Sequence, residues 1–142
     1  MKNKILSHQS LYTDAAILIL RLVFGVLFMY HGYAKIVAYH EILPQFPDMI
    51  GIGSKLSFHL LIFAEFFCGF FVAIGILTRL SVIPIFIAMA VAYFIAHGKD
   101  PFDMKELSLL FMILSGVIFL LGGGKYSLDR LIFTRKSNSP KH

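Results

Sequence analysis

The chain has 142 residues, of which 58% are hydrophobic and 15% charged, and its net charge is +5. Soluble domains contain about 45–50% apolar residues, so this composition indicates a membrane protein and leaves room for one domain, without a separate catalytic domain. The basic residues flank apolar runs instead of clustering on one polar face, which favours anionic lipid over nucleic acid as their counter-charge. The single cysteine excludes an intramolecular disulfide.

Apolar runs that could cross a bilayer follow one another along the chain. Lys2 and Lys4 precede the first run as in a signal peptide, but this run is too long and has no cleavage motif, so we expect an uncleaved helix. A span needs about 20 mostly apolar residues, and the four segments that qualify are residues 15–35, 56–77, 80–97 and 104–121. The sequence therefore predicts an all-α integral membrane four-helix bundle formed by residues 1–142 as a single domain.

The connections between these segments predict the topology. Residues 36–55 form a long connection with prolines and glycines among apolar side chains, which we expect to fold onto the bundle as a lid or an interfacial helix. The other connections, 78–79 and 98–103, are tight, so the helices that they join are antiparallel neighbours. The result is an up-down-up-down bundle with both termini on one side.

The end of the chain predicts a short additional helix. Gly122–Gly124 can cap the fourth span, and Ser127 can cap a C-terminal amphipathic helix that carries Leu128, Leu131 and Ile132 on one face.

The distribution of basic residues predicts the orientation. Eight lie on the terminal side and four on the other, namely Lys2, Lys4, Arg79, Lys125, Arg130, Arg135, Lys136 and Lys141 against Lys35, Lys55, Lys99 and Lys105. Because basic residues are retained on the cytoplasmic side, we expect a multi-pass protein of the bacterial cytoplasmic (inner) membrane with both termini in the cytoplasm.

Small and charged residues share one stripe on each of the first two helices. Spacings of three and four place them on one face, and the glycines allow a neighbouring helix to approach closely. We expect the two stripes to face each other, with Gly25, Gly32 and Gly69 as helix-packing residues. The stripes comprise Arg21, Gly25, Phe28, Gly32 and Lys35 on the first helix and Leu61, Glu65, Cys68, Gly69 and Val72 on the second.

Arg21 and Glu65 are the ionisable residues deepest in the predicted spans. An ionised side chain in the bilayer costs at least ~2.5 kcal/mol, which makes both functional candidates. A rise of 1.5 Å per residue separates their levels by roughly 8 Å, which a long arginine can nearly bridge. The pair can be a structural ion pair that fixes helix register or part of a polar pocket for a small ligand. His31 lies near the level of Glu65, so a proton path from outside through His31 to Glu65 is a further hypothesis.

Several polar residues fall at the outer ends of the helices, but they do not predict a metal site. No pair of them has the spacing of metal ligands on one helix. We expect Lys35, His97 and Glu106 to be interfacial, with the Lys35 ammonium reaching outward to the membrane surface. The set comprises His31, His40, His59, His97, Asp100, Asp103 and Glu106.

The motifs along residues 15–131 together resemble the DoxX family of bacterial membrane proteins. The resemblance rests on Arg21 to Gly25, Phe28, His31 to Lys35, Glu65, Gly69, Gly75, Thr78-Arg79, Gly122 to Gly124 and Tyr126 to Asp129. It implies a four-helix membrane bundle and, for some relatives, service as a small subunit of quinone-linked oxidoreductases such as thiosulfate:quinone oxidoreductase, or of membrane complexes that defend against oxidants. The family pattern carries onto Arg21, Gly25, His31, Gly32, Lys35 and Glu65. The chain lacks paired haem-type histidines on facing stripes.

Three functions fit this sequence. The first, which the resemblance favours, is a membrane subunit or partner of a quinone-linked oxidoreductase, without activity alone and with no covalently bound cofactor, in which Arg21, Glu65 and His31 line a quinone pocket. The second is a small proton-coupled or solute carrier that uses the same residues. The third is a non-catalytic scaffold that holds a redox partner protein in the bilayer. Substrate, partner and homo-oligomerisation stay open.

Overall fold

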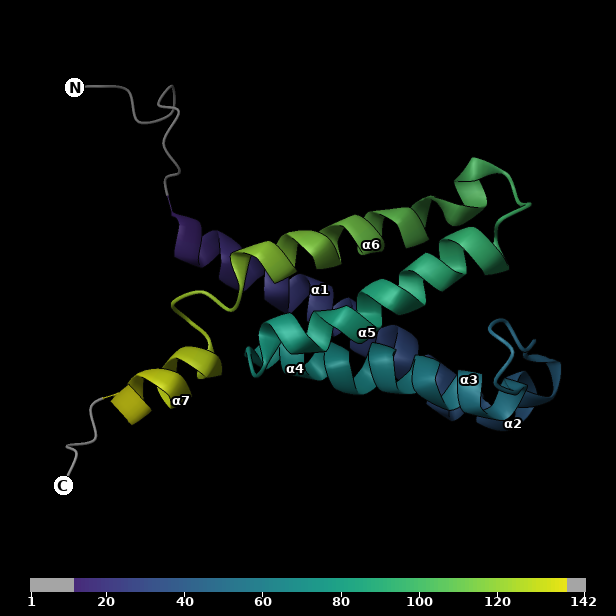
Figure 1. Cartoon of the computed structure of the whole chain (residues 1–142), viewed down its shortest axis with the longest axis horizontal. Coiled ribbons are helices and arrows are strands. Elements are labelled where there is room, and N and C mark those ends of the chain that lie inside the picture. Colours follow the sequence, from purple (N-terminus) through teal and green to yellow (C-terminus); the bar gives the residue numbers. More distant parts are fainter. Residues whose placement is uncertain (1–11, 138–142) are drawn as a thin grey trace.

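Four long helical segments run along the molecule in alternating directions within residues 12–137, which are the residues that the computed structural model describes (Figure 1). Each is long and apolar enough to cross a membrane. Their bounds lie within a few residues of the predicted spans, so the prediction of an all-α membrane bundle is confirmed. The segments are α1 (Thr13–Val37); α3 (Ser54–Ile62), η3 (Phe63–Cys68) and α4 (Gly69–Ile74); α5 (Thr78–Val91) and η4 (Ala92–Ala96); and α6 (Phe102–Leu121).

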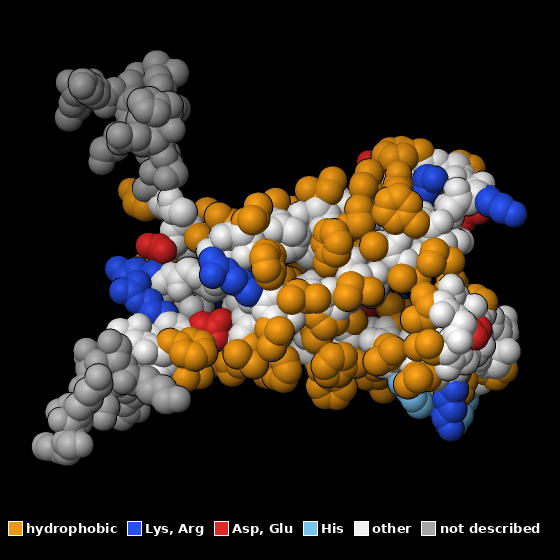
Figure 2. Space-filling model, in the orientation of Figure 1, with side chains coloured by type: hydrophobic (Ala, Val, Ile, Leu, Met, Phe, Trp, Pro, Cys, Tyr) orange, Lys and Arg blue, Asp and Glu red, His pale blue; other side chains and the backbone are white. Residues whose placement is uncertain are grey.

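The bundle has two distinct ends, and the chain enters and leaves it at the same one. The end where α1 begins and α6 finishes is here called the termini end, and the end with residues 38–53 and 97–101 is called the loop end (Figure 1). The up-down-up-down topology is therefore confirmed. Figure 2 shows the matching surface, with hydrophobic side chains over the middle of this face and charged side chains gathered toward its ends.

Glycines on the first two spans bring α1 against η3 and α4. A β-carbon at Gly25 would lie 2.5 Å from the carbonyl oxygen of Gly69, and one at Gly32 would lie 2.6 Å from the amide nitrogen of Phe66. A side chain at either position would therefore collide with backbone. The structure thus places Gly25, Gly32 and Gly69 at the contact that their stripes predicted.

The core fills the half of the bundle nearer the termini end, whereas the helices diverge toward the loop end. Phe24, Val72, Val82, Ile85 and Ile118 are almost completely buried there. In Figure 1, α5 and α6 stay together but separate from α3 toward the loop end. Accordingly α5 packs mainly against α6, η3 and α4. This divergence leaves space between the helices.

The turn between α4 and α5 differs from the prediction. We expected a connection at 78–79, but Thr78 and Arg79 belong to the first turn of α5, and the connection is residues 75–77. Gly75 has a φ of +78°, a left-handed conformation suited to glycine. The Asp129 carboxylate accepts hydrogen bonds from the amides of Leu77 (2.6 Å) and Thr78 (2.9 Å). A carboxylate distant in sequence thus caps α5, which local sequence patterns could not reveal.

A short helix, α7 (Leu128–Ser137), follows the fourth span. Gly122 ends α6 with a φ of +74°, and the amide of Arg130 donates to Ser127 Oγ at 3.3 Å. Leu131 and Ile132 are exposed on this helix. The predicted glycine cap, the serine cap and the C-terminal helix are therefore confirmed.

Candidate functional site

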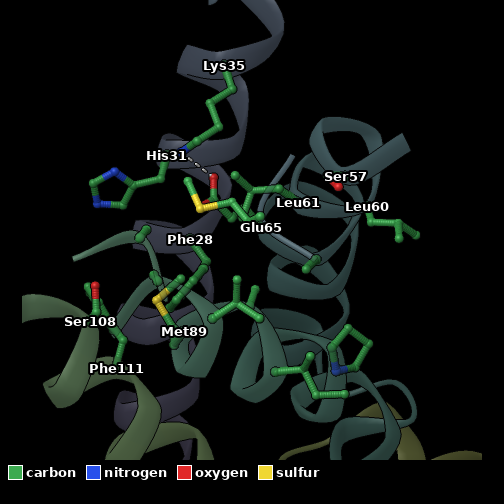
Figure 3. Close-up of a pocket in the computed structure, with 18 of the residues that line it drawn as sticks. Phe28, His31, Lys35, Ser57, Leu60, Leu61, Glu65, Met89, Ser108 and Phe111 are labelled. Atoms are coloured by element: carbon green, nitrogen blue, oxygen red, sulfur yellow. Dashed lines mark hydrogen bonds and ion pairs between the residues drawn. The ribbon is translucent and has the colours of Figure 1, made fainter. Parts of the chain in front are cut away.

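The divergence of the helices creates a pocket of about 570 Å³ in the half of the bundle toward the loop end (Figure 3). Every spanning segment contributes to its wall, and most of the contributing side chains are apolar. The lining comprises Phe28, His31, Lys35, Phe46, Met49, Ile50, Ser57, Leu60, Leu61, Phe63, Ala64, Glu65, Pro84, Ile87, Ala88, Met89, Val91, Ala92, Ala96, His97, Leu107, Ser108 and Phe111.

Small side chains explain why the space is not filled. Ala88, Ala92 and Ala96 recur every four residues along α5 and η4 and all line the pocket. They contribute methyl groups to this part of the wall, beside the larger Ile87 and Met89. Ala64 does the same on η3. Alanines at helical spacing therefore contribute to the space in the pocket.

Aromatic rings form the floor of the pocket. The rings of Phe28 and Phe111 both line it and lie 4.8 Å apart between centroids. Phe24 packs behind them, 4.8 Å from Phe28 and 5.8 Å from Phe111. Edge and tilted contacts of this kind are favourable for aromatic pairs. This cluster joins the pocket to the packed core, so the space stops there.

The long connection forms a cover at the loop end, as predicted. It contains α2 (Tyr39–Ile42) and a 3₁₀ turn, η2 (Leu43–Gln45), and its residues Phe46, Met49 and Ile50 line the pocket. The ring of Phe46 lies 4.9 Å from that of the buried Phe58 on α3. We call residues 46–53 the lid.

A single carboxylate organises the lid. Asp48 accepts hydrogen bonds from the amides of Gly51 (2.9 Å), Ile52 (3.1 Å) and Gly53 (3.0 Å). These bonds, led by the one from Gly53, hold the pKa of the Asp48 carboxyl below its ordinary value. Asp48 therefore ties the amides at the end of the lid to one side chain.

An ion pair lies in the wall of the pocket. Lys35 Nζ is 2.7 Å from Glu65 Oε2, and the side chains are 25% and 6% exposed, respectively. Figure 3 shows the Lys35 side chain descending from α1 to meet Glu65 on η3. The prediction that Lys35 reaches outward to the membrane surface is thus wrong. The nearby buried carboxylate is a stronger attraction for its ammonium than the interface.

Arg21 does not pair with Glu65, and it does not line the pocket. Its guanidinium turns toward the termini end and donates to the carbonyls of Val72 (3.1 Å), Ala73 (3.3 Å), Tyr126 (3.2 Å) and Gly123. These carbonyls belong to the last turn of α4 and to the segment between α6 and α7, where few carbonyls have helical partners; that of Val72 also accepts from the Gly75 amide at 3.2 Å. The predicted Arg21–Glu65 pair is therefore wrong, and Arg21 ties three parts of the chain together.

The remaining predicted residues lie near the pocket in different ways. His31 lines it, but its imidazole points away from Glu65 in Figure 3 and stacks edge-on 6.4 Å from Phe111. His97 also lines it and is 2.8 Å from the Asp100 carboxylate at the loop end. Glu106 is exposed. Within residues 12–137 no group of His, Cys, Asp or Glu side chains is arranged to hold a metal ion.

Two features of the site escaped sequence reasoning. The hydroxyl of Ser57 is buried in the pocket wall and has no hydrogen-bond partner in the described part of the chain. Glu65 lies in η3, a π-helical segment, and a second such segment, η4, forms part of the opposite wall. Short π-helical segments are frequent at functional sites. Nothing in the local sequence distinguishes them from regular helix.

The arrangement can bind an amphipathic molecule. An unpaired buried hydroxyl costs roughly 1–3 kcal/mol, so Ser57 provides a donor and acceptor without a partner. The ion pair offers a cation and a carboxylate beside it, and the rest of the wall supplies apolar contacts. A mostly apolar pocket with few converging polar groups is typical of small-molecule sites.

Comparisons with known proteins agree with this architecture. The DoxX family model matches residues 16–98. The chain is 32% identical to the inner membrane protein YqjF of Escherichia coli, over 84% of this chain and 93% of that protein. It is 30% identical to an uncharacterized membrane protein of Mycobacterium tuberculosis, over 84% and 83% of the two chains. An uncharacterized protein of Haemophilus influenzae is 26% identical over 87% of each. No solved structure matches the chain.

Proposed function

The chain belongs to the DoxX family of membrane proteins, and we propose that it binds a lipid-soluble quinone in its pocket as a membrane partner of a quinone-linked oxidoreductase. The observation that carries this proposal is the Lys35–Glu65 ion pair, with its carboxylate almost fully buried in an otherwise apolar cavity. A buried pair is weak evidence for stability, and ionisable groups within the membrane are usually functional.

The residues present suit a quinone. The volume of about 570 Å³ lies within the range of about 300–1,000 Å³ typical of ligand pockets. Quinone oxygens accept hydrogen bonds, and the Lys35 ammonium and the unpaired Ser57 hydroxyl are donors in the pocket wall. The rings of Phe28 and Phe111 offer faces and edges against which a flat head group can pack.

The protein's own residues have distinct roles in this proposal. A bound quinone supplies reversible redox chemistry coupled to proton transfer. Lys35 donates a hydrogen bond to an oxygen of the head group, and Glu65 Oε2 holds or releases the proton that accompanies the reaction. The aromatic floor orients the ring, and the lid excludes water from the loop end. The electrons come from or go to a partner protein.

A binding site fits the geometry better than a channel. Below the aromatic floor, Val72, Val82, Ile85 and Ile118 are almost completely buried, so the pocket ends halfway through the described bundle.

The distribution of basic residues supports both termini in the cytoplasm of a bacterial inner membrane. The pocket then belongs to the outer half of the bilayer. Fusion of an alkaline phosphatase reporter to either terminus should give no activity, and an active fusion would overturn this orientation.

Quinone retention tests the proposal directly. The protein is purified gently from its native membrane, extracted with organic solvent and analysed for quinones by chromatography and absorption. We expect near-stoichiometric quinone in the wild type and a loss of most of it in Ala92→Leu, which fills the pocket. Ala90→Leu, on the same helix but outside the lining, is the matched control and should retain it. Absence of quinone from the wild type, together with no binding of added decylubiquinone, would refute the proposal.

A further inference from the structure

The wall of the pocket is incomplete on one side of the bundle. Leu60 on α3, Phe63 on η3 and Ile87 on α5 all line the pocket, yet they expose 47%, 46% and 56% of their surface. A side chain that both lines a cavity and reaches the outer surface marks a mouth. Leu107 on α6 (53%) and Ile50 in the lid (47%) also line the pocket and are exposed. The other three lie on the second and third spans, which diverge toward the loop end (Figure 1), and this divergence places the mouth between these spans.

This mouth faces lipid. Its three residues belong to the helical segments that are long and apolar enough to span the membrane. Ile87 and Glu65 each lie about two and a half turns from the α4–α5 connection, which is near mid-span. A route for water-soluble molecules would carry polar side chains, whereas Leu60, Phe63 and Ile87 are apolar.

The ion pair of the pocket lies away from the mouth, whereas the buried Ser57 lies one turn before Leu60 on α3 (Figure 3). Lys35 comes from α1, and Glu65 points toward it across η3 (Figure 3). Ser57, whose hydroxyl lacks a partner, is buried. The lid covers the loop end with Phe46, Met49 and Ile50. The pocket is therefore polar inside and apolar at its lateral opening, so it matches a molecule with a polar head and a hydrocarbon tail.

We propose that the pocket opens sideways into the bilayer between α3–η3 and α5, and that its ligands enter head first and leave a long hydrocarbon tail in the mouth among the lipids. The identity of the head group rests on the function proposed above, but the lateral opening does not. The opening favours tailed, membrane-dissolved molecules over small solutes that arrive from water.

Photolabelling from the lipid phase tests the opening without any quinone. The full chain is placed in phosphatidylcholine and phosphatidylglycerol vesicles that contain a trace of phospholipid with a diazirine near the end of its acyl chain. After irradiation, labelled residues are located by mass spectrometry. Met89 and Val82 are both buried on α5, but only Met89 lines the pocket. We expect Met89 to be labelled several-fold more than Val82, and equal labelling would overturn the lateral opening.

Variants at the mouth provide the second measurement. Leu60→Trp and Ile87→Trp narrow the mouth and should each reduce the labelling of Met89 several-fold. Leu56→Trp, one turn earlier on α3, equally exposed and outside the lining, is the matched control and should leave it unchanged. Unchanged labelling in both folded mouth variants would also overturn the inference. If a variant does not fold, the ratio of Met89 to Val82 in the wild type still decides.

Competition separates this inference from the proposed function. Decylubiquinone should reduce the labelling of Met89, whereas the same ring without its tail should compete at least several-fold more weakly. If Met89 is labelled but neither compound competes, the opening stands and the quinone proposal fails. If decylubiquinone binds while Met89 stays unlabelled, or if both compounds compete equally, the quinone proposal stands and the tail requirement is wrong.

Discussion

Replacing the residues of the pocket ion pair one at a time and together should reveal strong coupling between Lys35 and Glu65. The two single replacements should differ in their effect on the free energy of unfolding. The two groups are 2.7 Å apart, and the carboxylate is much more deeply buried than the ammonium. Lys35→Met leaves an uncompensated carboxylate in an apolar wall. Glu65→Gln leaves a lysine that can extend toward the membrane surface. The first change should therefore destabilise the fold more than the second.

The expected magnitudes follow from the burial of each partner. Removing one partner from a buried pair costs about 3–5 kcal/mol, and Lys35→Met should cost about 3 kcal/mol because the remaining group is almost fully buried. Glu65→Gln should cost about 1 kcal/mol. The Lys35 ammonium that remains is more exposed than the carboxylate, so removing its partner should reduce folding stability less. The double variant removes both charges and should be more stable than Lys35→Met alone, with a coupling energy of about 1–3 kcal/mol.

The free energy of unfolding in mixed detergent micelles, with SDS as denaturant, measures these differences. The matched control is the cycle of Arg21→Met with Glu65→Gln, in which we expect additive losses because the hydrogen bonds of Arg21 within residues 12–137 go to backbone carbonyls and not to Glu65. Additive losses for Lys35 and Glu65, or strong coupling of Arg21 with Glu65, would refute the pairing described here. A double variant that folds but retains no quinone would separate the stability of the pair from its function.

Three further changes should have effects of predictable sign. Gly32→Ala places a β-carbon 2.6 Å from the amide of Phe66 and should cost about 1–3 kcal/mol in the same unfolding assay, whereas Gly116→Ala, with open space around it, should be neutral or stabilising by up to ~1 kcal/mol. Arg21→Lys should cost about 3 kcal/mol, because an ammonium lacks the planar fork that reaches several carbonyls, and unfolding at wild-type denaturant concentration would contradict this. The pKa of Asp48 is lower in the folded than in the unfolded chain. Its contribution to folding stability is therefore fully present above the unfolded pKa of about 4, and it is lost as the pH falls through the folded pKa. The melting temperatures of wild type and Asp48→Asn should therefore differ at pH 7 and converge below pH ~4, and a pH-independent difference would count against the role of Asp48 in the lid.

The fold was predictable from the sequence because hydropathy, loop length and glycine spacing are local or periodic properties. Each span is long and apolar enough to cross a membrane, so its position can be predicted without knowledge of its neighbours. Gly25 and Gly32 lie one and three turns from Arg21 on one stripe, and the contacts at both glycines follow from that stripe.

The pairing of charges was not predictable in the same way. Arg21 and Glu65 are the most deeply placed charges on the first two helices, and their separation in depth permitted a contact. The choice depended on competitors that lie far away in sequence. Arg21 donates to the carbonyls of Gly123 and Tyr126. Glu65 pairs with Lys35, which lies at the other end of the α1 stripe that carries Arg21. Hydropathy and residue spacing cannot decide whether Glu65 pairs with Arg21 or with Lys35.

The two charged sites divide the bundle into halves with different tasks. At the termini end, Arg21 and Asp129 satisfy backbone groups at the ends of α4 and α5, and the tightly packed core above them gives the fold its rigidity. At the loop end, alanines form part of the wall of a cavity, Ser57 has an unpaired hydroxyl, and the Lys35–Glu65 ion pair lies in the cavity wall. A scaffold would gain nothing from an unfilled cavity with a buried carboxylate in its wall. Thr78 at the termini end also has a buried hydroxyl without a partner among the described residues, so the unpaired hydroxyl does not distinguish the two halves. The cavity and the ion pair in its wall occur in the loop-end half, and they are the physical basis of our proposal that this half binds a ligand.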